Sequence, residues 1–159
     1  MPPEYFRAGA GAVIVNAAGL VLALERKGLP GAWQLPQGGL ERAEDPLAAA
    51  YREIAEETGI GRDDLRLLDA KPELLAYELP AKARSEKTGR GQTNYWFLFR
   101  FTGRDDAIDI IGGGEFGRWQ WMPATKLQAK TVDFRRPVYR RLIERFRPHL
   151  APGEAPQDG

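Results

Sequence analysis

The segment Tyr95–Phe101 consists almost entirely of apolar and aromatic residues, and Arg100 is its one charged residue. A strand with one face in water alternates apolar and polar side chains, whereas a strand covered on both faces has a continuous apolar sequence. The segment therefore predicts a strand inside a layered structure, with other elements packed against both of its faces.

Further strands and a helix are expected around this segment. Ala10–Val15 and Leu20–Glu25 flank turn-forming residues at 16–19, so they predict a hairpin. A helix over Pro137–Arg147, stopped by Pro148, follows from the four-residue spacing of Val138, Leu142 and Phe146. The remaining strand-like segments are Arg66–Leu68, Leu74–Leu79 and Arg118–Trp121. The expected fold class is α/β, with a mixed sheet and helices against it.

Length and composition narrow the class of protein. The 159 residues fit one domain, expected over residues 1–150, followed by a Pro- and Gly-rich tail over 151–159 that is expected to be disordered. The absence of cysteine excludes disulfides, thiolate metal sites and a cysteine nucleophile, and the single histidine, His149, excludes mechanisms that need two. The chain contains no apolar run near the length of a membrane span and no signal peptide. We expect a cytoplasmic monomer that does not bind membranes.

The net charge of +1 conceals an uneven distribution. Residues 81–93 carry a net charge of +3 and residues 126–147 carry +6, so the rest of the chain is strongly acidic. Separate acidic and basic regions suit a protein that holds cations in one place and phosphates in another. For such runs alone, the better interpretation is that the arginines line the solvated face of a helix.

One predicted helix carries a cluster of like charges. Asp45 is expected to be its N-cap, Pro46 its first residue and Gly59 the residue past its end. At about 100° per residue, Arg52 falls on the far side of the helix from the acidic cluster. The face expected to pack on the sheet comprises Leu47, Ala50, Tyr51, Ile54 and Thr58, and the neighbouring face carries Glu53, Glu56 and Glu57. These glutamates repel one another, and Mg²⁺ or Mn²⁺ among them would offset the repulsion. Taken alone, the helix fits a metal site and an acidic helix without a ligand equally well.

The glutamates belong to a longer pattern. The sequence Gly38-x5-Glu44-x7-Arg52-Glu53-Ile54-x-Glu56-Glu57-x-Gly59-Ile60 resembles the Nudix box at every defined position. The resemblance implies a Nudix hydrolase, with an α/β/α sandwich in which a mixed sheet lies between helices. It also implies a Mg²⁺-dependent enzyme, with Mn²⁺ as a substitute, that cleaves a nucleoside diphosphate linked to another moiety.

The same resemblance implies roles for individual residues. Glu53 would be the general base, with Glu56 and Arg52 in the catalytic group. Independently of the resemblance, Arg52 could anchor the helix or a preceding loop by a salt bridge. The implied metal ligands are the Gly38 carbonyl, Glu53, Glu56, Glu57 and, from a loop outside the box, Glu115. A lone loop glutamate is more often simply exposed, and this is the alternative for Glu115.

Outside the box, the chain resembles the bacterial RNA pyrophosphohydrolases and the related dinucleoside polyphosphate hydrolases. The similar stretches are Ala32–Gly39, Gly91-Gln92 with Trp96–Leu98, Glu115-Phe116 with Trp119–Trp121, and Val132–Arg136 with Val138–Arg141. This resemblance implies RNA processing and mRNA decay, by removal of pyrophosphate from triphosphorylated RNA 5′ ends. Hydrolysis of diadenosine tetraphosphate is the alternative.

Substrate-binding roles follow from this second resemblance. Arg7, Arg26 and Arg135 would contact phosphates, Gln37 would line the site, and Val132 and Phe134 would hold a base between them. Arg7 and Arg26 could instead be solvated surface arginines, and Phe134 could be a core residue. We interpret Trp33, Trp119 and Trp121 as core residues and His149 as a surface residue.

A further alternative is a catalytically inactive Nudix domain that only binds nucleotides or RNA. The intact cluster of Glu53, Glu56 and Glu57 argues against it, because a binding module gains nothing from clustered acids beside a polyanion.

Overall fold

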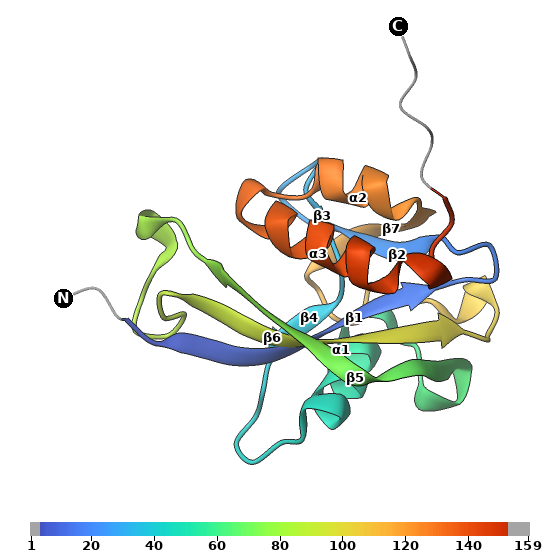
Figure 1. The fold of residues 1–159 in the computed structure, drawn as a ribbon, viewed down its shortest axis with the longest axis horizontal. Coiled ribbons are helices and arrows are strands. Elements are labelled where there is room, and N and C mark those ends of the chain that lie inside the picture. The colour runs from blue at the N-terminus through green and yellow to red at the C-terminus, as the bar shows by residue number, and fades with distance from the viewer. Residues whose placement is uncertain (1–3, 153–159) are drawn as a thin grey trace, which may run out of the picture.

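The computed structural model describes residues 4–152, which form a three-layered structure around a seven-stranded mixed sheet (Figure 1). The strands are β1 (Phe6–Val15), β2 (Val21–Arg26), β3 (Trp33–Gln34), β4 (Gln37–Gly39), β5 (Leu65–Glu78), β6 (Gly91–Phe101) and β7 (Phe116–Met122). Their order is β3-β2-β1-β6-β5, with β4 paired to β1 and β7 paired to β2. The sheet is mixed because β1 is parallel to β6 and antiparallel to β4.

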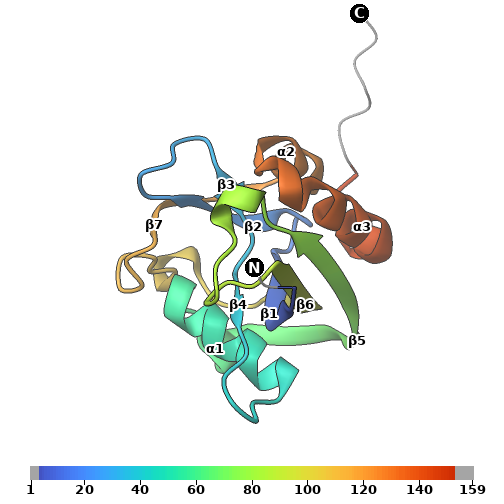
Figure 2. The same ribbon diagram turned by 90° about the vertical axis from the view of Figure 1, so that its left-hand side faces the viewer.

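Helices cover both faces of the sheet, as Figure 2 shows. Helix α1 (Pro46–Thr58) lies against one face, and α2 (Ala124–Lys130) and α3 (Arg136–Phe146) lie against the other. Short 3-10 turns connect the elements: η1 (Arg62–Asp64), η2 (Ala81–Ala83), η3 (Asp105–Ala107), η4 (Asp133–Arg135) and η5 (Arg147–His149). The predicted α/β/α sandwich is confirmed.

Strand β6 joins the two halves of the core, as its apolar sequence predicts. Phe97, Phe99 and Phe101 pack in the core on the α1 side of the sheet. Trp96 and Leu98 point the other way, into the core beneath α2 and α3. The alternation of side chains along a strand therefore supplies both layers from one apolar segment.

The predicted hairpin is correct only at its turn. Strands β1 and β2 pair at a single position, Val15 with Val21, and then diverge. Beyond the turn, β1 pairs with β6 and β4, and β2 pairs with β7 and β3, so each strand satisfies its backbone groups elsewhere.

One further expectation about the strands needs correction, and three short elements are not predicted. The segments expected as separate strands at 66–68 and 74–79 form one strand, β5, whose pairing with β6 shifts between Leu67, Asp69 and Glu73. Pro72 lies inside this irregularity, where its missing N–H breaks no ladder bond. Helix α2 and the short strands β3 and β4 are not predicted, because none is long enough to show a clear period.

The predicted helices agree with the structure to within about a residue. Helix α3 begins at Arg136 and ends at Phe146, before Pro148, and buries Val138, Leu142 and Phe146. Trp33 is buried, and Trp119 and Trp121 are half-buried against the α1-side core. His149 is exposed. Residues 153–159 of the predicted tail lie outside the described residues. No helix within residues 4–152 is long and apolar enough to cross a membrane.

Candidate metal and phosphate site

Helix α1 begins and ends where the sequence indicates, and this fixes the direction of its glutamates. The Asp45 carboxylate accepts hydrogen bonds from the backbone N–H groups of Leu47 at 3.1 Å and Ala48 at 3.2 Å. Gly59 adopts a left-handed conformation with φ of 72°, and its N–H donates to the Ala55 carbonyl. Glu53 and Glu57 then point inward, whereas Glu56 is exposed.

The inward pair, Glu53 and Glu57, is a strained electrostatic arrangement. The side chains are 8% and 5% exposed, respectively. Burial raises the pKa of both carboxyl groups, and the Glu53 charge raises the pKa of Glu57 further. The Glu57 Oε2 atom is buried and has no hydrogen-bond partner in residues 4–152. A positive charge placed between these carboxylates would counter both the burial and the repulsion.

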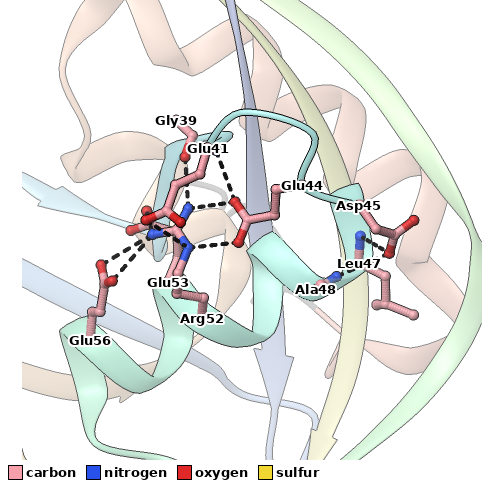
Figure 3. Close-up of polar contacts among 9 residues, drawn as sticks. All are labelled: Gly39, Glu41, Glu44, Asp45, Leu47, Ala48, Arg52, Glu53 and Glu56. Atoms are coloured by element: carbon pink, nitrogen blue, oxygen red, sulfur yellow. Dashed lines mark hydrogen bonds and ion pairs between the residues drawn. The ribbon is translucent and has the colours of Figure 1, made fainter.

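Arg52 occupies a different place from the one predicted. It lies beside the acidic cluster rather than on the far side of α1, because Arg52 and Glu56 have the i,i+4 spacing that places two side chains on one face of a helix (Figure 3). Its guanidinium nitrogens lie 2.8 Å from Glu53 and 3.2 Å from Glu56. Its predicted anchoring role is confirmed by two 2.8 Å hydrogen bonds to Glu44 and one of 2.9 Å to the Gly39 carbonyl.

The ion pair of Arg52 with Glu44 shifts the pKa values of both groups in the direction that favours their charged forms. The hydrogen bonds from Arg52 lower the pKa of Glu44 to about 2, and the Glu44 carboxylate raises the pKa of Arg52. Arg52 therefore joins the loop before α1 to the carboxylates on it, which makes it a positioning residue for the cluster.

Gly38 and Gly39 allow side chains to approach the backbone of β4. A Cβ atom on Gly38 would lie 2.1 Å from the Glu53 Cδ atom, so only glycine leaves room for this carboxylate. A Cβ atom on Gly39 would lie 2.2 Å from the Arg7 Nη2 atom, which places the Arg7 guanidinium over this strand. The structure therefore brings Arg7, Gly38 and Glu53 to one place from three segments of the chain.

Glu115 reaches the same place from the loop before β7. Its charge contributes to the raised pKa of Glu57. The preceding glycine-rich turn packs on the end of α1, since a Cβ atom on Gly113 would lie 2.6 Å from the Glu56 carbonyl oxygen. The Glu115 side chain, which follows this turn, is exposed.

The donor chemistry of this cluster suits a hard divalent cation. Carboxylate and carbonyl oxygens are the ligands that Mg²⁺ and Mn²⁺ prefer, and the orphaned Glu57 Oε2 atom is a buried donor that needs a positive partner. Within residues 4–152, no three acidic or histidine side chains are already arranged as a metal-binding group. Arg52 pairs with Glu53 and Glu56 instead.

A polar cluster on the other side of β1 is not predicted from the sequence. The Tyr77 hydroxyl donates to the Gln92 Oε1 atom at 2.6 Å, and the Gln37 amide donates to the Tyr77 hydroxyl at 3.0 Å. Asn94 is fully buried, and neither of its side-chain amide atoms has a partner in the described part of the chain. Gly9 makes room for this cluster, since its Cβ would lie 2.3 Å from the Asn94 Oδ1 atom. Gln92 belongs to a stretch noted in the sequence, but only the strand register places it beside Gln37 and Tyr77.

Phe134 and Arg135 lie at the edge of this polar cluster, on η4. The Phe134 ring is half-buried, with its centroid 5.3 Å from that of Tyr77. The Arg135 guanidinium lies 5.0 Å from the Phe134 ring and 5.6 Å from the Tyr77 ring, and it donates to the Gln34 Oε1 atom at 3.3 Å. Phe134 therefore combines a packed face with an accessible one.

Val132 and Arg26 both lie at the loop over residues 29–32. Val132 is half-buried and lines an open hollow together with the loop over residues 29–32. Arg26 is exposed at the end of β2, where its backbone N–H donates to the Ala32 carbonyl at the base of the same loop. The structure therefore brings both residues to the loop over residues 29–32.

The sequence comparisons bear directly on this arrangement. The family description "NUDIX domain" matches residues 5–142 of the chain. The chain belongs to the Nudix family. The match includes β1, α1 and η4, so it covers every element of the candidate site.

Other Nudix proteins resemble the chain over most of its length. An RNA pyrophosphohydrolase of Cereibacter sphaeroides is 40% identical, and the alignment covers 92% of this chain and 93% of that protein. Nudix hydrolase 26, chloroplastic, of Arabidopsis thaliana is 35% identical over 94% of this chain and 73% of that protein. The predicted membership of the Nudix hydrolases is confirmed, and Nudix hydrolases are generally dependent on divalent metal ions.

Solved Nudix structures share the fold at lower identity. A C. elegans Ap4A hydrolase binary complex superposes with a TM-score of 0.69 at 23% identity, covering 89% of this chain and 98% of that one. The E. coli dihydroneopterin triphosphate pyrophosphohydrolase gives a TM-score of 0.70 at 23% identity, covering 89% and 99%. These likenesses confirm the architecture.

Proposed function

We propose that the protein is a Mg²⁺-dependent RNA 5′-pyrophosphohydrolase. Water attacks the triphosphate of a 5′-triphosphorylated RNA, and the products are pyrophosphate and a 5′-monophosphorylated RNA. The observation that carries the proposal is the 40% identity to an RNA pyrophosphohydrolase over nearly the full length of both chains, which includes the acidic cluster and the Phe134 region alike.

The carboxylates of α1 form the proposed metal site. Glu53, Glu56, Glu57, the Gly38 carbonyl and Glu115 would hold Mg²⁺, with Mn²⁺ as a substitute. The bound cations would supply Lewis-acid chemistry by bridging the polyphosphate to these carboxylates and activating water. Glu53 is the proposed general base, because it is buried beside Gly38 and is oriented by Arg52.

The cationic and aromatic side chains form the proposed substrate site. Arg7 lies over Gly39, next to the carboxylates, where it would neutralise substrate phosphates. Gln37 and Arg135 would bind polar groups of the RNA, with Arg26 as a further phosphate contact. A base would stack on Phe134 and pack against Val132, because the Phe134 ring is only half-buried.

The two competing candidates are a hydrolase with the same chemistry and a different substrate, and an inactive nucleotide-binding domain. A dinucleoside polyphosphate hydrolase would use the same carboxylates on a polyphosphate between two nucleosides. In an inactive nucleotide-binding domain, the unfavourable burial of Glu53 next to Glu57 would serve no function.

The decisive experiment compares initial rates on four substrates at equal concentration. These are 5′-triphosphorylated RNA, diadenosine tetraphosphate, ADP-ribose and free nucleoside triphosphates. We expect the highest kcat/KM on triphosphorylated RNA, with no turnover in excess chelator and recovery on adding Mg²⁺. A preference for diadenosine tetraphosphate would select the alternative, and undiminished turnover in chelator would refute the metal site.

A further inference from the structure

The basic residues of α3 divide into two sets with different surroundings. Arg141 and Arg145 face β5, where they pair with Glu73 at 3.1 and 3.2 Å, and Arg145 also pairs with Asp69 at 3.0 Å. These ion pairs fasten the helix to the edge of the sheet. Within residues 4–152, the other set lies on a different face and forms no ion pair with β5.

The second set follows the junction of α3 with α2. Arg136, Arg140, Ile143 and Arg147 have the spacing i, i+4, i+7 and i+11, so they form one stripe along the helix. The stripe faces α2, because Ile143 shares an apolar cavity with Ala124 and Leu127, and Arg136 donates to the Ala129 carbonyl at 3.3 Å. We call this junction, with Lys126 and Lys130 of α2, the α2/α3 seam.

The seam is bounded by open hollows at both ends. One, of about 430 Å³, is lined by the loop over residues 29–32, residues 129–132 and Arg136. The other, of about 400 Å³, is lined by Thr125, Ile143, Arg147 and residues 150–152. Val132 lines the first hollow, so the seam starts directly beside the proposed base site.

The charge of the seam is largely uncompensated. Within residues 4–152, Lys126, Lys130, Arg140 and Arg147 form no ion pair, and all four are exposed. Arg136 pairs with Asp133 at 3.2 Å, and that acid is 93% exposed. Unpaired cations in a row attract a polyanion, because their potential adds along the row.

The charge and the length of the seam indicate which kind of ligand it binds. The apolar face of α3 is already buried in the core through Val138, Leu142 and Phe146, so the exposed side of the seam presents mainly its basic side chains. A helix of eleven residues spans about 16 Å, which gives room for several backbone phosphates. A single-stranded nucleic acid fits these features better than a membrane surface or an apolar protein partner.

We propose that the α2/α3 seam binds the phosphodiester backbone of the RNA beyond the nucleotide stacked on Phe134. The inference rests on the proposed function for the identity of the substrate and extends it, since it predicts that longer RNAs bind more tightly. Dinucleoside polyphosphates end before the seam and gain nothing from it.

The test measures binding separately from catalysis. A fluorescently labelled octaribonucleotide with a 5′-hydroxyl end is titrated by anisotropy over a range of salt concentrations. The seam variant combines Lys130→Gln, Arg140→Gln and Arg147→Gln, none of which lies in the proposed catalytic site. The matched control combines Arg66→Gln, Lys71→Gln and Arg104→Gln, which removes the same charge from β5 and the turn before η3.

For the seam variant we expect octamer binding to weaken by about tenfold at low salt. The slope of log affinity against log salt should fall by about 2, since each lost phosphate contact removes about 0.7 from the slope for single strands. KM for the triphosphorylated octamer should rise similarly, while kcat/KM for a triphosphorylated dinucleotide stays at the wild-type value. The control variant should keep most of the affinity and the slope.

The outcomes separate this inference from the proposed function. If the seam variant and the control variant bind the octamer with equal affinity, the α2/α3 seam does not bind the RNA backbone. This conclusion holds whether or not the wild type hydrolyses RNA. If octamer binding depends on the seam but the wild type releases no pyrophosphate from triphosphorylated RNA, RNA binding by the seam is supported and the proposed function is wrong.

Discussion

Helices α1 and α3 both carry rows of like charge, but they resolve the repulsion differently. Helix α3 turns Arg141 and Arg145 toward acids of β5, whereas Arg140 and the C-cap residue Arg147 stay in water. Helix α1 buries two glutamates side by side, with Arg52 as the cation that reaches Glu53. Paired and solvated charges cost little, whereas a buried pair of like charges is maintained at a cost in folding free energy.

The difference indicates where the chemistry lies. Perturbed pKa values at a convergence of polar groups are typical of catalytic and metal-binding sites. The arginines of α3 matter for long-range attraction and for attachment to the sheet. Substitutions in the two helices should therefore have opposite signatures, with lost turnover in α1 and lost stability or RNA affinity in α3.

The largest effect is expected for Glu53→Gln. The turnover number should fall by at least ~10²-fold, because the substitution removes the proposed base and a metal ligand. The melting temperature should change little, since the substitution relieves the unfavourable burial of Glu53 beside Glu57 but also removes the ion pair with Arg52. Steady-state kinetics and thermal unfolding measure the two quantities. As a control, Glu144→Gln on α3 should leave turnover unchanged, and wild-type turnover by a folded Glu53→Gln variant would contradict the site.

Gly38→Ala tests the close approach of the Glu53 carboxylate to β4. The added Cβ would lie 2.1 Å from the Glu53 Cδ atom, so the carboxylate must move. A displacement of about 1 Å can cost ~10²-fold in rate, and we expect a loss of that order in kcat. Gly61→Ala is the matched control, because a Cβ there meets no atom within 4 Å. Equal rates in the two variants would show that this contact has no part in catalysis.

Phe134→Ala separates stacking from packing. Stacking of a base is worth about 1–3 kcal/mol, which corresponds to ~5- to 150-fold in kcat/KM on triphosphorylated RNA. A nucleoside triphosphate, which has no second base, should be affected much less. The ratio of the two kcat/KM values is the measurement. If both fall equally and the melting temperature drops, Phe134 is a core residue only.

Glu44→Gln tests the anchor of the acidic cluster through pH. The pKa of Glu44 is lowered from 4.5 to about 2 in the folded state, so its ionised form stabilises the protein above pH 4.5. That contribution is lost as the pH falls from 4.5 toward 2. The variant should be less stable at neutral pH and should show a smaller further loss over this acid range. Urea unfolding midpoints across pH measure this, and parallel curves for variant and wild type would contradict it.

The smallest effect is expected on α3. Arg145→Gln removes partly exposed ion pairs to Asp69 and Glu73, so unfolding free energy should fall by about 0.2–1 kcal/mol with kcat unchanged. Arg140→Gln, which breaks no ion pair within residues 4–152, should leave stability unchanged. Urea denaturation of both variants measures the contrast, which disappears if the two lose the same stability.

Local signals in the sequence account for much of the fold. The capping residues Asp45 and Gly59 define α1, the spacing of Val138, Leu142 and Phe146 defines α3, and the apolar run of β6 predicts a layer on each side. The pattern from Gly38 to Ile60 identifies the family. Each of these signals depends on residues within about one element, where propensity and periodicity act.

Only the tertiary structure decides what lies between the elements. The sequence does not show that β1 leaves β2 after one pair, that Arg52 turns toward Glu53, or that Tyr77 and Gln92 meet Gln37. The burial of Glu53 and Glu57, and hence their raised pKa values, also arises only when β4 and the loop before β7 close over α1. These features join residues far apart in the chain. Their free energy comes from burial and from strand register, which no single segment specifies.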